Sequence, residues 1–167
     1  DFAEAIVDNL SSQYCIDQDR LYGIGYSLGS MFTYEIACQL NHRFAAVASF
    51  AGTMPVDPET CELVGGMGVL HIHGKLDYII DYDDDWDWKD GEHEGVGTMS
   101  NVPGMIEAWS MRANCGSSDT DADFFLEHIT HSDCFGGARV EHYGIEFWEH
   151  TWPDEVDGTP TYQLMWD

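Results

Sequence analysis

The stretch Gly25-Tyr26-Ser27-Leu28-Gly29 constrains the fold more than any other feature of this sequence. An apolar run from Leu21 to Tyr26 predicts a strand before it, and apolar residues at helical spacing predict a helix after it, up to about Asn41. A G-x-S-x-G pattern between a strand and a helix is typical of a sharp turn that presents its serine as a nucleophile. The alternative is a glycine-rich turn with an incidental serine, since five-residue patterns recur by chance.

Other segments have the apolar patterns of helices and buried strands. The sequence predicts helices over Phe2–Gln13 and Val102–Ala113, strands over Phe44–Ala51, Val69–Gly74 and Arg139–Phe147, and a polar loop over Cys115–Asp123. Strands that alternate with helices favour a parallel α/β sheet. We expect a single domain over residues 1–167, because no repeat or linker interrupts the chain.

Composition excludes several classes of protein. The net charge is −25, from 31 acidic and six basic side chains, so the chain could not neutralise phosphates and we expect no nucleic-acid partner. We expect no membrane partner either, because no apolar run approaches the roughly 20 residues that span a bilayer. So acidic a surface suggests adaptation to a saline setting, where salt screens the self-repulsion.

Five cysteines in a chain of this size suggest an oxidising compartment. An odd number leaves one thiol unpaired, and Cys15 is the expected one because it lies nearest the start. The sequence has no initiator Met and opens inside a predicted helix, so we expect a processed protein or a fragment.

Two further residues follow predicted strands in the order that a catalytic triad requires. Asp77 follows the strand that ends near His73, and His150 follows the strand that ends near Phe147. A serine nucleophile needs a base to take its proton and an acid to orient that base, in the order Ser, Asp, His in one large fold class. We therefore expect Ser27, His150 and Asp77 to fill these roles, with the N–H of Leu28 as one oxyanion donor.

The landmarks of the chain resemble a known family, the extracellular polyhydroxybutyrate depolymerases and the related feruloyl and acetyl-xylan esterases, which are α/β-hydrolases. The resemblance covers nearly the whole chain and rests on Asp19-Arg20-Leu-Tyr, Arg43-Phe-Ala-Ala-Val-Ala, Ala51-Gly-Thr-Met-Pro, Leu70-His-Ile-His-Gly, Ala108-Trp109 running into Asn114-Cys115, and His150-Thr-Trp-Pro. It implies a secreted serine esterase without a cofactor. The implied substrate is a polyester or an acyl ester of a plant polysaccharide.

The chain departs from that family in three respects. Phe147-Trp148-Glu149 stand where the family usually has glycines, and Leu28-Gly29-Ser30 stand where it often has Asn-Gly-Gly. The family's earlier strands, with the loop that supplies the second oxyanion donor, should precede residue 1. We therefore expect these residues alone to be weakly active and to expose a sheet edge.

The resemblance also bears on the cysteines and the pocket. Relatives often place a disulfide where Cys115 and Cys134 lie, and Cys38 with Cys61 is a plausible second pair, although the sequence does not fix connectivity. Trp148 and Trp152 are expected to line the substrate pocket because they flank His150, and Tyr26 is expected there with them. Trp109 is expected in the core, and the remaining histidines are interpreted as surface or loop residues, namely His42, His93, His128, His131 and His142.

Two patterns leave metal binding open as an alternative. His71 and His73 share one face of a strand, but no third ligand is evident, so we expect no metal there. The stretch Asp83–Asp90 begins like a calcium loop but has Trp88 in place of the required glycine, which favours a solvated acidic insertion. A second hypothesis for the whole chain is a non-catalytic carbohydrate-binding or calcium-stabilised module that uses these Asp and Trp residues.

Overall fold

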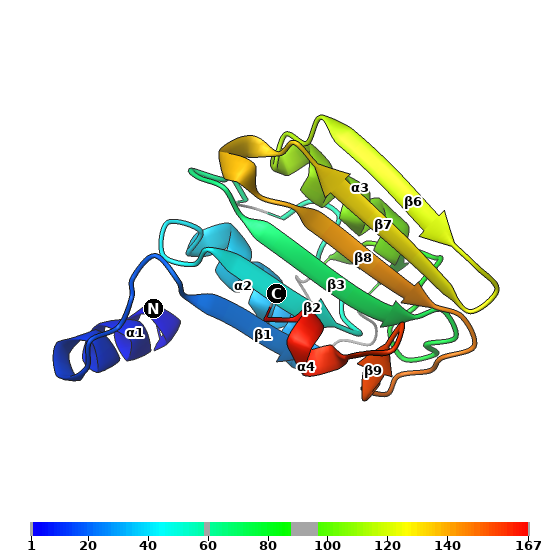
Figure 1. Cartoon of the computed structure of the whole chain (residues 1–167), viewed down its shortest axis with the longest axis horizontal. Helices are drawn as coiled ribbons and strands as arrows, with labels where there is room; N and C mark the ends of the chain where they lie inside the picture. Colours follow the sequence, from blue (N-terminus) through cyan, green and yellow to red (C-terminus); the bar gives the residue numbers. More distant parts are fainter. Residues whose placement is uncertain (1, 59–60, 88–96, 167) are drawn as a thin grey trace.

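The protein is described by a computed structural model over residues 2–58, 61–87 and 97–166. Its centre is a six-stranded sheet in the order β1-β2-β3-β8-β7-β6 (Figure 1). The strands are β1 (Tyr22–Tyr26), β2 (Ala46–Phe50), β3 (Gly68–Gly74), β6 (Ser117–Ala122), β7 (Leu126–Ser132) and β8 (Val140–Ile145). β1, β2, β3 and β8 run parallel, whereas β7 and β6 run antiparallel to their neighbours.

The central parallel strands are buried, as their apolar sequences predict. Four of the five residues of β2 are buried, as are most residues of β3, because both strands lie between other strands and carry continuous apolar runs. Their register pairs Val47 with Val69 and Phe50 with Ile72. The carboxyl ends of the four parallel strands therefore meet at one edge of the sheet.

Two long helices cover one face of the sheet. Helix α2 (Leu28–Gln39) packs on β1 and β2, and helix α3 (Val102–Arg112) packs on β8 and β3. Asn101 caps α3 by accepting a hydrogen bond from the Gly104 N–H, and Pro103 lies in the first turn. Trp109 of α3 is fully buried and stacks on Tyr34 of α2 at 5.7 Å between ring centroids, which confirms its expected place in the core.

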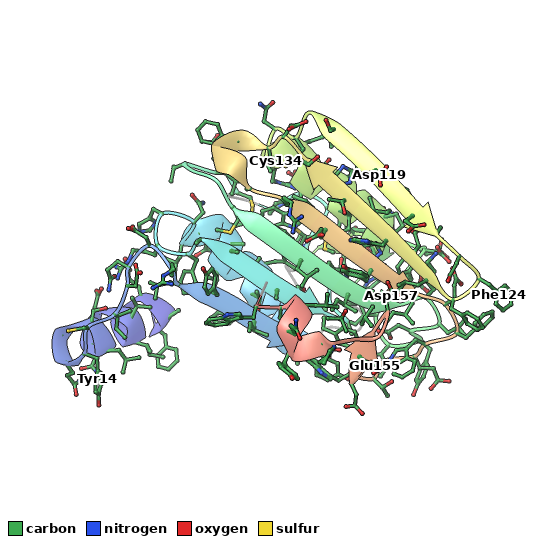
Figure 2. All side chains as sticks on the ribbon, viewed as in Figure 1. Tyr14, Asp119, Phe124, Cys134, Glu155 and Asp157 are labelled. Atoms are coloured by element: carbon green, nitrogen blue, oxygen red, sulfur yellow. A yellow bond between two sulfur atoms is a disulfide. The ribbon has the colours of Figure 1, made fainter. Side chains whose placement is uncertain are left out.

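The polar loop expected over Cys115–Asp123 is wrong, because Ser117–Ala122 forms the edge strand β6 and pairs with β7. All six residues of β6 are exposed, so the strand has no apolar face from which its structure could be predicted. Figure 2 shows Asp119 on this outer strand and Phe124 at the hairpin tip. Charged side chains on an edge strand oppose pairing with other chains.

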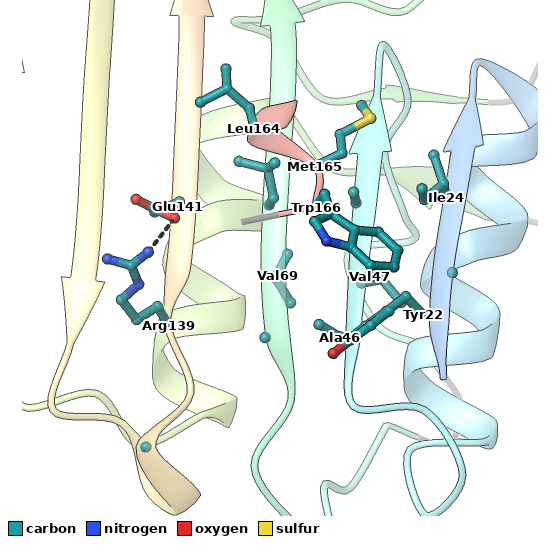
Figure 3. A pocket seen from close by; sticks show the side chains of 15 residues that line it. Tyr22, Ile24, Ala46, Val47, Val69, Arg139, Glu141, Leu164, Met165 and Trp166 are labelled. Atoms are coloured by element: carbon teal, nitrogen blue, oxygen red, sulfur yellow. Dashed lines mark ion pairs between the residues drawn. The ribbon is translucent and has the colours of Figure 1, made fainter. Parts of the chain in front are cut away.

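The opposite face of the sheet carries the short helix α4 (Thr161–Leu164), as Figure 3 shows. A shallow pocket of about 240 Å³ lies beneath it, lined by Tyr22, Ile24 and Trp166 among others. Arg139 and Glu141 form an ion pair of 3.3 Å at its rim. This pocket contains neither Ser27 nor His150.

The smaller elements lie outside the main sheet. They are helix α1 (Phe2–Gln13), the 3-10 turn η1 (Phe135–Gly137), and the two-stranded ladders β4 (Trp86–Asp87) with β5 (Thr98–Met99) and β9 (Glu155–Val156) with β10 (Thr159–Pro160). Helix α1 lies at one end of the molecule, beyond β1 (Figure 1). Within the described ranges, no helix combines the length and the apolar character needed to cross a membrane.

Two disulfides join the elements in the pairs that were expected. Cys38 at the end of α2 is bonded to Cys61, and Cys115 before β6 is bonded to Cys134 after β7. The second disulfide closes the base of the β6–β7 hairpin. Cys15 is free and exposed, as expected.

Candidate active site

Ser27 lies on the turn between β1 and α2, in a backbone conformation that few side chains adopt. Its φ is 56° and its ψ is −120°, and its N–H donates to the Phe50 carbonyl oxygen at 2.9 Å. Such strain at a strand-to-helix turn places a serine hydroxyl above the strand ends. A Cβ at Gly25 would overlap the Gly29 carbonyl and the Thr33 hydroxyl, so this position needs glycine for β1 and α2 to approach.

His150 connects Ser27 to Asp77 through its two ring nitrogens. Its Nε2 lies 2.9 Å from the Ser27 Oγ, and its Nδ1 lies 2.6 Å from the Asp77 Oδ2. An ionised carboxylate only accepts hydrogen bonds, so Nδ1 carries the hydrogen and Nε2 of the neutral ring accepts from the Ser27 hydroxyl. The three side chains thus form one directed chain of hydrogen bonds.

Asp77 is held in place by its own loop as well as by His150. Its Oδ1 accepts from the backbone N–H groups of Ile79 and Ile80, both at 2.9 Å, and His73 Nε2 lies 3.2 Å from its Oδ2. Burial alone would raise the pKa of Asp77, but the hydrogen bonds from His73, Ile80, His150 and Ile79 outweigh it and lower the pKa to about 2. The carboxylate therefore stays ionised at neutral pH.

The loops that carry Asp77 and His150 touch directly after β3. The Leu76 N–H donates to the Trp148 carbonyl oxygen at 2.9 Å, and a Cβ at Gly74 would overlap that same carbonyl. Phe147 adopts a φ of 57°, a left-handed conformation that glycine adopts more easily. Phe147 therefore makes a turn here that a glycine would make with less strain.

The three residues expected in the substrate pocket, Tyr26, Trp148 and Trp152, do not all lie beside His150. Tyr26 donates its hydroxyl hydrogen to the His150 carbonyl oxygen at 2.9 Å, and its ring contacts the His150 ring at 5.3 Å between centroids. Trp152 packs against Phe50 and Tyr26. Trp148 lines a separate cavity of about 290 Å³ with Phe125 and Pro153, and its indole N–H donates to Thr151. Tyr26 therefore contacts His150 directly and Trp152 packs against Tyr26, whereas Trp148 lines the neighbouring cavity.

Leu28 follows Ser27 as the first residue of α2. N–H groups in the first turn of a helix have no acceptor within the helix, and they carry the positive end of its dipole. The Leu28 N–H therefore has the place expected of an oxyanion donor.

Sequence reasoning missed several buried polar residues behind the site. His142 and His131 were expected at the surface, but they are 0% and 8% exposed. That prediction is wrong for His142 because β8 lies inside the sheet and is covered on one face by α3, and it is wrong for His131, the one buried residue of β7. His71 and His73 are fully buried and hydrogen-bonded to each other, and burial lowers the pKa of His71 and lowers that of His142 to about 3.

The possible metal positions give no ligand cluster in the part of the chain that the structure describes. Of the acidic stretch Asp83–Asp90, residues 88–90 lie outside the described residues, as does His93. Asp85 accepts hydrogen bonds from the backbone N–H and the side chain of Asn101, and so supports the start of α3.

The fold is that of the α/β-hydrolases, a mostly parallel sheet with flanking helices and a serine on the turn after a strand. A solved acetyl xylan esterase from Aspergillus awamori has the same fold, with a TM-score of 0.61 and 15% sequence identity, over 89% of this chain and 60% of that one. Residues 2–86 match the model of the Phospholipase/Carboxylesterase family. The chain belongs to that family.

Two curated relatives agree with this assignment. The chain is 31% identical to "Putative esterase NocK" of Nocardia uniformis subsp. tsuyamanensis, over 92% of this chain and 48% of that protein. It is also 31% identical to "Bifunctional acetylxylan esterase/xylanase XynS20E" of Neocallimastix patriciarum, over 97% of this chain and 22% of that protein. The chain therefore spans about half the length of the first of these relatives and less of the second.

Proposed function

We propose that this protein is a serine carboxylic-ester hydrolase in which Ser27 is the nucleophile, His150 the general base and Asp77 the orienting acid. The hydrogen-bond chain from Asp77 through His150 to Ser27 carries the proposal. Family membership supports the same class of reaction. A serine without a catalytic role does not account for the strained backbone at Ser27. Nor does it account for a histidine that is hydrogen-bonded to an ionised carboxylate.

In the proposed mechanism, His150 Nε2 takes the hydroxyl proton as Ser27 Oγ attacks the ester carbonyl carbon. The negative charge on the carbonyl oxygen is stabilised by the N–H of Leu28. His150, now an imidazolium stabilised by Asp77, gives its proton to the leaving alcohol as the acyl-enzyme forms. His150 then removes a proton from water, which attacks the acyl carbon, and passes that proton to Ser27 Oγ as the bond to the acyl group breaks and the acid is released.

We further propose an acyl ester of a plant polysaccharide, feruloyl or acetyl, as the substrate, and an extracellular location. Relatives named as acetylxylan and feruloyl esterases support the first part. Two disulfides support the second part, since such bonds persist in oxidising compartments.

The decisive experiment compares the full-length protein with its Ser27→Ala variant in the hydrolysis of p-nitrophenyl acetate. We expect the variant to lose about four to six orders of magnitude in kcat. Ser12→Ala serves as the matched control, because Ser12 lies on α1, where its hydroxyl donates to the Asn9 carbonyl oxygen of the same helix. A fluorophosphonate should label the wild type and not the Ser27→Ala variant, as judged by intact mass.

Equal hydrolysis by wild type and Ser27→Ala, or no labelling of either, would reject the nucleophile and favour a non-catalytic binding module. If the esterase is established, methyl ferulate, acetylated xylan and hydroxybutyrate oligomers then distinguish the substrate classes. Preference for the hydroxybutyrate oligomers would contradict the proposed substrate while leaving the triad intact.

A further inference from the structure

A line of buried polar side chains continues from Asp77 into the core, away from Ser27. His73 Nε2 lies 3.2 Å from the Asp77 Oδ2 and 3.1 Å from the Ile80 carbonyl oxygen. His73 Nδ1 lies 3.0 Å from His71 Nε2, and His71 Nδ1 lies 2.7 Å from the Tyr34 hydroxyl. His71 and His73 are 0% exposed and Tyr34 is 1% exposed, so no solvent competes for these hydrogen bonds.

The partners of His73 fix where its hydrogen lies. Its Nε2 faces a carboxylate oxygen and a carbonyl oxygen, and both are acceptors, so Nε2 must be the donor. In a neutral ring Nδ1 is then an acceptor, which requires His71 to donate from Nε2. His71 must in turn accept at Nδ1, and the Tyr34 hydroxyl supplies that hydrogen. The hydrogens of Tyr34, His71 and His73 are therefore all directed toward Asp77, and the His73 Nε2–H faces both the Ile80 carbonyl oxygen and the Asp77 carboxylate.

The opposite direction is disfavoured by charge. A hydrogen on both nitrogens of His73 would reverse His71 and would make a buried ion pair with Asp77, whose desolvation can cost more than its attraction returns. Burial, together with the neighbouring His73 and His142, lowers the pKa of His71 well below its usual range, and burial raises the pKa of the Tyr34 hydroxyl. Both groups therefore stay neutral with the hydrogens that the line needs.

We propose that His73 is a positioning residue for Asp77, held in its donating tautomer by His71 and Tyr34. The inference rests on the proposed function, since Asp77 matters only if His150 is a base. A neutral donor fixes the Asp77 oxygen toward His150 Nδ1 and stabilises the carboxylate without cancelling its charge. The full negative charge then remains to stabilise the imidazolium of His150 in the transition state.

The test compares two substitutions at His73 in the full-length protein. Gln keeps an N–H donor close to the place of the imidazole Nε2, whereas Met fills a similar volume without a donor. We expect His73→Met to lower kcat by about 10- to 100-fold with KM unchanged, because Asp77 loses its orientation and not its contact with substrate. We expect His73→Gln to keep most of the wild-type kcat.

The proton between His150 Nδ1 and Asp77 gives a readout that needs no substrate. In the protein at low pH it should appear as a far-downfield proton resonance, assigned by its absence in His150→Gln. It should persist in His73→Gln and be lost or shifted in His73→Met. An unchanged resonance and kcat in His73→Met would overturn the proposal, as would equal losses in two variants that both fold.

A measurement on the wild type decides the matter if His73→Met does not fold. Long-range nitrogen–proton correlation spectra distinguish histidine tautomers, and we expect His73 and His71 both to carry hydrogen on Nε2 alone. Hydrogen on Nδ1 of either ring would overturn the proposal. Failure of the proposed function is seen separately, as a wild type that neither hydrolyses esters nor is labelled at Ser27.

Discussion

His150 is held in place both at its ring and at its backbone. Asp77 binds the ring Nδ1 at 2.6 Å, and Tyr26 donates to the carbonyl oxygen at 2.9 Å. Tyr26 directly precedes Ser27 in the chain, so this hydrogen bond connects the turn that carries Ser27 to the loop that carries His150. Tyr26 was expected to contact the substrate, whereas this hydrogen bond gives it a role in ordering the His150 loop. The two roles predict different changes in kcat and KM.

Tyr26→Phe removes the hydroxyl and keeps the ring that stacks on Phe50. A hydrogen bond of this kind contributes about 1 kcal/mol, so its loss should lower kcat by about fivefold through a less ordered His150. We expect KM to stay the same, which steady-state kinetics on a p-nitrophenyl ester measures. A change confined to KM would instead assign the Tyr26 hydroxyl to the substrate.

Some residues of the candidate site could be predicted from the sequence, and others could not. Ser27, Asp77 and His150 could be singled out because each follows a strand, and parallel strands bring their carboxyl ends together. The line from His73 to Tyr34 could not be predicted, because its members come from β3 and α2 and meet only through the packing of that helix on the sheet. His142 was misjudged for the same reason, since alternation on a strand does not tell which face is covered.

The β1–Ser27–α2 unit depends on how closely its strand and helix approach. A Cβ at Gly25 would overlap the backbone oxygen of Gly29, which cannot move without displacing α2. A Cβ at Gly29 would meet nothing within 4 Å, so the second glycine of the motif is not required by the fold. The two glycines of one motif therefore have different structural roles.

Gly25→Ala should destabilise the protein by about 2 kcal/mol or more, because overpacking between elements forces the backbone to shift. Gly29→Ala is the matched control, and it should be neutral or slightly stabilising since alanine favours a helix over glycine. Urea unfolding followed by circular dichroism measures both free energies of unfolding. Equal stability of the two variants would mean that α2 moves away from β1 at little cost.

The elements themselves differ in how far the sequence predicts them. α1, α2, α3, β1, β2, β3 and β8 follow their apolar patterns within a few residues at each end. β6 and β7 do not, because β6 has no buried residue and the ladder is formed by backbone groups that any sequence supplies. The Cys115–Cys134 disulfide brings the two ends of this hairpin together, and pairing of two cysteines cannot be deduced from their spacing.

Charge is the property that involves the whole molecule. Of the six basic side chains, Arg20, Arg43, Lys75 and Arg139 already lie within ion-pair distance of carboxylates. Most acidic side chains therefore have no basic partner, and the net charge of −25 makes them repel one another. Such repulsion destabilises the compact folded state. Added salt weakens such repulsion because the Debye length falls from about 30 Å at 0.01 M to about 3 Å at 1 M.

We therefore expect the Tm at pH 7 to rise by about 5 °C or more between 0.01 M and 1 M NaCl. Sodium chloride is the appropriate salt, because sulfate and phosphate stabilise proteins of any charge by exclusion from their surface. The same series at about pH 4.5, where a substantial share of carboxylates binds protons, should give a smaller rise. Differential scanning calorimetry measures both series. A Tm that stays constant or falls with NaCl at pH 7 would show that the acidic groups are spaced widely enough for their repulsion not to limit stability.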